Sequence, residues 1–221
     1  MSYRRTPLVK EEIYHVYNRG VAKQPTFLNH KDYERSMLAL SYYRFRKVPM
    51  RLSRFKELSN QLRNELLERL QNTSKHVDII SFVLMPNHFH FLLKQNEENG
   101  ISIFLSKFTN SYTKYFNTKR SRTGPIFQGV FKSVHIESNE QLIHVSRYIH
   151  LNPVASFLID ESELFSYPWS SLPDYLKGKS SLINLDIVLK QFPSTNEYQK
   201  FVADRIDYSK KLEQIKHLTL E

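Results

Sequence analysis

The sequence predicts an α+β fold, in which one antiparallel sheet has helices packed on one face. Segments that alternate like strands are interleaved with segments that have the period of helices. Two adjacent apolar runs are joined by Pro86-Asn87, a turn signal that predicts a tight antiparallel hairpin. The 221 residues include 40% hydrophobic and 13% aromatic side chains. The chain can therefore build a sizeable core, and disorder along its whole length is excluded.

The strands are predicted from alternation and from apolar runs. Residues 12–19 (EIYHVYNR) alternate and give the first strand. The run from Val77 to Met85 is apolar almost throughout and has the length of a buried strand. The chain returns through HFHFLLK as its partner strand, and a further strand is expected over residues 126–135.

Helices are predicted where apolar residues recur every three or four positions, at 31–47, 54–72, 101–118 and 139–151. The second segment is strongly charged, which is typical of an insertion on the outside of a domain. The last begins at the capping-box pattern Ser138-x-x-Gln141, and Pro153 should stop it.

Beyond Pro168 the signals weaken into short helices and loops. We therefore expect a main domain over residues 1–175, which contains the helical insertion at 50–76. Residues 176–221 would form a C-terminal helical appendage.

The charge of the chain points to a polyanionic partner. There are 32 Lys and Arg residues against 22 Asp and Glu residues, a formal net charge of +10, and the sequence pI is about 9.6. Residues 36–56 and 101–136 contain several cations and no acid, and aromatic residues run through both. An isolated charge run is usually a solvated helix face. Two such stretches with aromatics that can stack on bases favour nucleic acid.

Several classes of protein are excluded by missing motifs. The absence of cysteine removes disulfides, Cys-ligated zinc, iron–sulfur clusters and thiol nucleophiles. There are only five glycines, and the glycine motifs of dinucleotide folds, P-loop NTPases and nucleophile-elbow hydrolases are missing. The first residues hold no signal-peptide core, and no run of 18 apolar residues occurs. We therefore expect a soluble cytoplasmic protein with no membrane partner.

Two histidines in the returning strand are candidate metal ligands. Side chains alternate in a strand, so His88, His90, Leu92 and Lys94 share one face. Two imidazoles at i and i+2 can bind one divalent ion through neutral nitrogens. Taken alone the pair is a weak signal, because histidines on a half-exposed strand are more often structural or solvated.

The helix at 139–151 carries a second row of polar residues. His144, Tyr148 and Asn152 follow one another at intervals of four, beside an apolar stripe of Leu142 and Ile149. A tyrosine at such a place can also be a packing residue with a solvated hydroxyl. Asn152 precedes a proline, which makes the direction of its side chain less certain.

Five segments in this order resemble the single-tyrosine HUH transposases, and most closely the REP-associated tyrosine transposases. They are Tyr17-Asn-Arg-Gly, the run FVLMPNHFHFLL from Phe82, GPIFQGVF from Gly124, YIHLNPV from Tyr148, and YPWSS from Tyr167. The resemblance covers about residues 10–175 and leaves the insertion and the tail unexplained. It implies a ferredoxin-like or RRM-like sheet.

The resemblance also implies roles for individual residues. His88 and His90 would be metal ligands, Asn152 the third ligand, and Tyr148 the nucleophile. The cofactor would be Mg²⁺ or Mn²⁺, and no nucleotide cofactor would be needed. The product would be a 5′-phosphotyrosine with a free 3′-hydroxyl. Tyr112 and Tyr115 lie on another helix and rank second as nucleophiles.

The implied substrate is single-stranded or hairpin DNA, bound by a monomer or a homodimer. Arg147 matches a basic position beside the tyrosine of this family. Our other candidates for phosphate contacts are Arg4, Arg5, Arg19, Lys23, Lys119, Arg120, Arg122 and Lys132.

Two other functions remain open from the sequence. One is a module on the same scaffold that binds nucleic acid without cutting it, although the RNP1 run of RRM domains is absent. The other is a metal-dependent phosphohydrolase that uses water, with Tyr148 as a packing residue. Replacement of Tyr148 by phenylalanine separates all three.

Overall fold

The computed structural model describes residues 7–218, with side chains as far as residue 215. Its centre is a four-stranded antiparallel sheet in the order β2-β3-β1-β4. The α+β class expected from the sequence is confirmed. The strands are β1 (Ile13–Arg19), β2 (Val77–Met85), β3 (His88–Gln95) and β4 (Lys132–His135).

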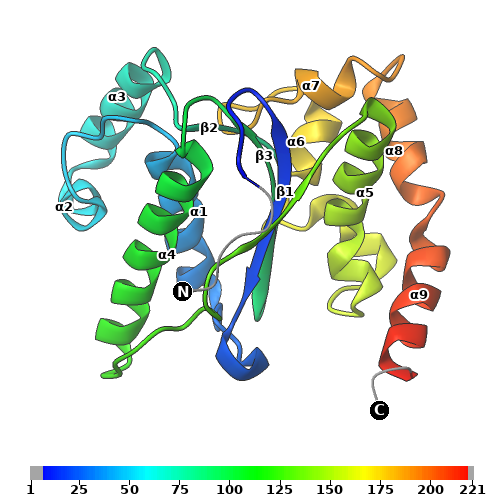
Figure 1. Cartoon of the computed structure of the whole chain (residues 1–221), viewed down its shortest axis with the longest axis horizontal. Helices are drawn as coiled ribbons and strands as arrows, with labels where there is room; N and C mark the ends of the chain where they lie inside the picture. Colours follow the sequence, from blue (N-terminus) through cyan, green and yellow to red (C-terminus); the bar gives the residue numbers. More distant parts are fainter. Residues whose placement is uncertain (1–6, 219–221) are drawn as a thin grey trace.

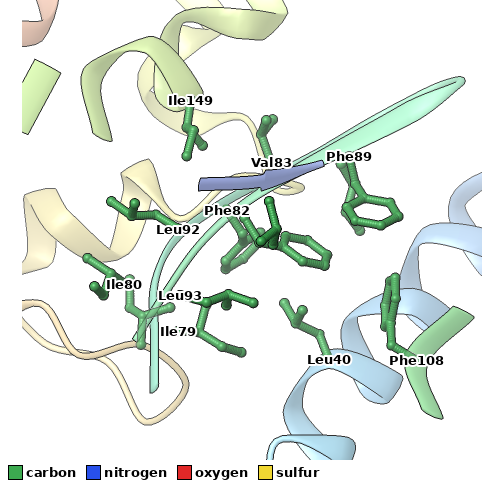
Figure 2. Close-up of a cluster of buried hydrophobic side chains, with 14 of the residues drawn as sticks. Leu40, Ile79, Ile80, Phe82, Val83, Phe89, Leu92, Leu93, Phe108 and Ile149 are labelled. Carbon is green, nitrogen blue, oxygen red and sulfur yellow. The ribbon is translucent and has the colours of Figure 1, made fainter. Parts of the chain in front are cut away.

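The hairpin of β2 and β3 forms the middle of the core. Pro86-Asn87 turns the chain, and Met85 then lies directly opposite His88. Every residue of β2 except Asp78 is buried, so β2 is covered on both faces. Figure 2 shows Ile149 on the side of Val83 and Leu92, and Phe108 on the side of Phe89.

Helices cover both faces of the sheet, whereas the sequence predicted them on one face only. Figure 1 shows α1 (His30–Tyr43) and α4 (Gly100–Lys119) on one side and α5 (Asn139–Ala155) on the other. Phe89 packs edge-on against Phe108 of α4. Leu92 and Ile149 are both fully buried on the opposite side. The second layer is required because the apolar stripe of α5 and the Leu92 face of β3 both have to leave water.

Helix α5 continues two residues beyond Pro153, which was expected to stop it. Ser138 caps its start, and its side chain accepts a hydrogen bond from the N–H of Gln141. Pro153 lies in the last turn, where its missing N–H removes a single helical hydrogen bond. Asn152 therefore keeps helical geometry and remains one turn beyond Tyr148.

The insertion consists of two helices rather than one. These are α2 (Leu52–Glu57) and α3 (Asn60–Gln71). The helix breaks at Ser59, whose side chain accepts a hydrogen bond from the N–H of Leu62 and so caps α3. Phe55 and Leu70 are the buried anchors of the pair.

The C-terminal part adds short helices to the side of α5. They are η2 (Glu161–Ser166), α6 (Leu172–Lys177), α7 (Asp186–Leu189), α8 (Thr195–Ala203) and α9 (Ile206–Leu218), and a further short turn, η1 (Val21–Lys23), follows β1. Helices α8 and α9 pack against α5. The buried hydroxyl of Tyr198 is 2.7 Å from Ser146 and 2.8 Å from His150, which ties α8 to α5. Within the described residues, no helix has the length and apolar character needed to cross a membrane.

Candidate active site

A pocket of about 480 Å³ opens between the start of β3, helix α5 and helix α9. Strand β3 contributes His88 and His90, and α5 contributes Tyr148 and Asn152. The structure thus brings together all four residues to which the family resemblance gives a catalytic or metal-binding role.

The two histidines point into the pocket from one face of β3. They are two residues apart, their ring centroids are 5.1 Å apart, and their planes are perpendicular. The Nδ1 of His88 is 2.6 Å from the side-chain oxygen of Asn87, so the turn that starts β3 also orients the first ring. Burial lowers the pKa of His88, and the hydrogen bond with Asn152 offsets part of this effect. His88 is therefore neutral at neutral pH, as metal ligation requires.

Helix α5 places Tyr148 and Asn152 above these rings. The Tyr148 side chain is 44% exposed, and its ring meets that of His90 edge-on with centroids 5.6 Å apart. Asn152 donates a hydrogen bond to the carbonyl oxygen of Tyr148 at 3.1 Å and also hydrogen-bonds to His88.

A third histidine supports the pair, and sequence reasoning missed it. The Nε2 of His15 in β1 lies 2.9 Å from the Nδ1 of His90, and both side chains are buried. Burial lowers the pKa of His15 to about 4, so its ring is neutral at neutral pH. The contact of His15 with Nδ1 of His90 fixes the orientation of the His90 ring. The pairing of β1 with β3 brings the rings together, and a sequence pattern does not give that register.

Helix α9 forms the outer wall of the pocket. Tyr208 and Glu213 of α9, and Arg205 in the turn just before it, line the pocket together with α5. The Glu213 carboxylate is close enough to His88 to act on the pKa of that ring. These residues were also missed, because the tail lies outside the family resemblance.

Two of the predicted phosphate contacts lie on the same sheet face as the histidines. Arg19 is directly opposite His88 in the β1–β3 ladder. Lys132 is opposite Tyr17, which is itself opposite His90. Both cations are exposed.

Other predicted contacts lie at varied distances from the pocket. Arg147 lines it, but its guanidinium stacks at 4.0 Å on the ring of Phe201 and donates to the carbonyl oxygen of Phe201. Lys23 and Arg122 are exposed, and neither lines the pocket, although the Lys23 carbonyl oxygen accepts a hydrogen bond from the Asn87 side chain beside His88. Arg4 and Arg5 lie outside the described residues.

Lys119 and Arg120 belong to the opposite helical layer. Both form ion pairs with the fully buried Asp32, at 2.9 and 2.6 Å. The Tyr115 hydroxyl donates to the same carboxylate. Tyr112 is fully buried, and its hydroxyl donates to the carbonyl oxygen of Thr26. Neither tyrosine of α4 lies in the pocket of the histidine pair.

The donors in the pocket fit a divalent ion of the Mn²⁺ or Mg²⁺ type. Within the described part of the chain, no three His, Cys, Asp or Glu side chains form a cluster that could hold a metal. A site here would therefore need the amide oxygen of Asn152 beside the imidazoles of His88 and His90. That mixed N/O set suits these ions.

Comparisons with known proteins show the fold and the family of the chain. A solved structure of a REP-associated tyrosine transposase bound to a REP hairpin matches with a TM-score of 0.51 and 16% sequence identity, over 84% of this chain and 90% of that one. That likeness shows the shared fold. No curated protein matches significantly. The family model described as "Transposase IS200 like" matches residues 40–152, about half of the chain, including the histidine pair, Tyr148 and Asn152. The chain belongs to the IS200-like transposase family, as its five sequence segments predicted.

Proposed function

We propose that this chain cuts and rejoins single-stranded or hairpin DNA through a covalent bond to Tyr148. The observation that carries this proposal is the exposed Tyr148 ring, which lies edge-on to His90 and one helical turn before Asn152, itself hydrogen-bonded to His88. The alternative nucleophiles Tyr112 and Tyr115 are bonded to acceptors in the other helical layer.

In the proposed reaction, the Tyr148 phenol oxygen attacks the scissile phosphorus. The new bond joins this oxygen to phosphorus, and the bond from phosphorus to the 3′-oxygen breaks. The phenol proton is lost to solvent, and the leaving oxygen takes up a proton to become a free 3′-hydroxyl. The phosphodiester energy is kept in the 5′-phosphotyrosine, so rejoining by a 3′-hydroxyl needs no nucleotide cofactor.

Tyrosine is a poor nucleophile at neutral pH, because its ordinary pKa is about 10. A divalent ion, Mg²⁺ or Mn²⁺, held by His88, His90 and Asn152 would supply charge stabilisation at the phosphoryl oxygens. His15 fixes the orientation of the His90 ring. Arg19 and Lys132 lie on the same sheet face as the histidines and would hold the strand through its phosphates.

The solved relative in complex with a hairpin supports DNA as the partner. Single-stranded or hairpin DNA is the proposed form, because the strand must enter the pocket between β3, α5 and α9 to reach Tyr148. The proposed working unit is a monomer or a homodimer.

The test is incubation of the full chain with labelled single-stranded and hairpin DNA, with Mn²⁺ or with EDTA, followed by a denaturing protein gel. A shifted band that needs metal and disappears in Tyr148→Phe supports the proposal. DNA binding without an adduct on any substrate would favour the non-cleaving module. Cleavage without an adduct would favour a hydrolase that uses water.

A further inference from the structure

A second groove lies on the side of the sheet away from the histidine pocket. It has a volume of about 930 Å³ and runs between α1, α4 and the insertion helix α2. Figure 1 shows these three helices together in the layer opposite α5. None of the five segments that carry the family resemblance lies in the insertion that forms one wall, so the resemblance gives this groove no role.

The groove is strongly cationic. One acid, Glu57, lines it. Lys119 is paired with Asp32, and Lys107 contacts the ring of His76. Exposed Arg51, Lys56 and Lys114 form no ion pair with any residue in the described range. The cations that line the groove are Arg35, Arg51, Lys56, Lys107, Lys114 and Lys119.

Arg35 distinguishes this groove from an ordinary solvated face. Its side chain is only 7% exposed, and its Nε has no hydrogen-bond partner. The guanidinium has one weak contact to the Ser111 hydroxyl, at 3.4 Å, and lies 5.5 Å from the ring centre of Tyr115. No carboxylate pairs with it among the described residues.

Two other arginines show which acceptors Arg35 lacks, although Nε of Arg44 and Nη1 of Arg120 also have no hydrogen-bond partner. Arg44 donates to two carbonyl oxygens and to the side chain of Gln71. Arg120 donates to the buried Asp32. A buried guanidinium without such acceptors carries a desolvation cost, which an incoming anion would remove.

The length of the groove favours a polymer over a single phosphate. Helix α4 borders it from Ser106 to Lys119, about 20 Å at 1.5 Å per residue. One strand of B-DNA carries a phosphate about every 3.4 Å along the axis, so about six phosphates would lie along this length. The rings of Tyr43 and Tyr115 add aromatic surface to the same walls.

We propose that this groove between α1, α2 and α4 binds the phosphodiester backbone of the DNA substrate, with Arg35 at its base contacting a phosphate. It is a second DNA contact, separate from the strand that enters the histidine pocket. The inference rests on the proposed function, since it takes DNA as the substrate.

The first test compares two charge-reversed variants of the full chain. Lys56→Glu/Lys114→Glu changes the groove, and Lys177→Glu/Lys179→Glu makes the same change in net charge at exposed lysines outside it. Binding of fluorescent hairpin DNA is measured by anisotropy over a range of salt concentrations. We expect the groove variant to bind at least about tenfold more weakly and to lose about 1.4–1.8 of the salt slope, the share of two phosphate contacts. Equal effects of both variants would overturn the proposal.

The second test uses Arg35→Gln, with its melting temperature as a control for folding. Because the substitution removes a buried charge that lacks an acid, we expect the free protein to melt no lower than the wild type, while DNA affinity falls at least about fivefold. A lower melting temperature with unchanged affinity would show a purely structural arginine and would overturn the proposal. Competition by inorganic phosphate as strong as that by DNA, at equal ionic strength, would also overturn it.

The same variants separate this proposal from the proposed function. Covalent adduct on Tyr148 is measured at saturating DNA for the wild type and for both variants, beside the binding assay. If wild type forms the adduct and the groove variant binds DNA normally, the groove proposal fails alone. If no protein forms the adduct but binding depends on the groove, the groove proposal stands and the cutting reaction fails.

Discussion

His15 should control the metal affinity of the pocket without touching the metal. Its Nε2 lies 2.9 Å from the Nδ1 of His90, and this contact is buried. When Nε2 of His90 faces a metal ion, its Nδ1 carries the proton and donates to His15. His15→Ala removes the acceptor and leaves that buried donor unpaired.

The size of the effect follows from this single bond. Loss of a hydrogen bond to a metal-ligating histidine weakens metal binding by about 10- to 100-fold. That change corresponds to about 1.4–2.8 kcal/mol of binding free energy. The truncation should also destabilise the fold, because His15 is only 9% exposed and its removal leaves a cavity.

Isothermal titration calorimetry with Mn²⁺ measures the affinity of the folded protein directly. His135→Ala is the matched control, because His135 lies in the same sheet and pairs with Glu12 on the surface. His15→Gln offers a replacement acceptor and should recover most of the affinity. If His15→Ala binds Mn²⁺ as tightly as wild type and only its melting temperature falls, the positioning role is refuted.

Three further predictions concern the rest of the fold and the DNA contacts. Asp32→Asn should cost about 3 kcal/mol, because it leaves Lys119 and Arg120 without their shared carboxylate, and the melting temperature should fall by about 6–12 °C. Burial alone would raise the pKa of Asp32, but the hydrogen bonds from Lys119, Arg120 and Tyr115 hold this pKa below its usual value. The stabilisation from the ionised carboxylate is complete above the pKa of the unfolded state and is lost as pH falls through the folded pKa. Asp32→Asn should therefore lose less stability in acid than the wild type, as measured by urea unfolding. Gly20→Ala would place its Cβ 2.1 Å from the carbonyl oxygen of Gln24, so we expect about 1–3 kcal/mol of destabilisation in the same assay, and an unchanged midpoint would contradict the close approach. If about six cations contact phosphates on a single strand, log K should fall against log salt with a slope near −4, and a slope close to zero would contradict cationic binding.

The local pattern of the sequence predicted how the four candidate residues lie within their own strand and helix. Alternation along β3 placed His88 and His90 on one face, and helical spacing placed Tyr148 and Asn152 one turn apart. These relations depend only on the geometry of one element, so a sequence contains them. The Pro86-Asn87 turn also predicted the hairpin that carries the histidines.

Relations between distant elements were harder to predict. His15 reaches His90 through the β1–β3 register, and helix α9 reaches the pocket by packing on α5. Ser59 divides the insertion because its side chain caps α3. In the sequence, this capping signal is weaker than the helical pattern on either side of it. Pro153 stays inside α5 because tertiary packing outweighs the loss of one hydrogen bond.

The most direct test of the central claim is to locate the DNA on the protein. The covalent product of the Mn²⁺ reaction is digested with nuclease and trypsin, and the peptide that retains a nucleotide is fragmented by tandem mass spectrometry. We expect the added mass on Tyr148, with none on Tyr112, Tyr115, Tyr167 or Tyr175. A nucleotide on any other tyrosine, or none in a reaction that cuts DNA, would contradict the assignment of Tyr148 as the nucleophile.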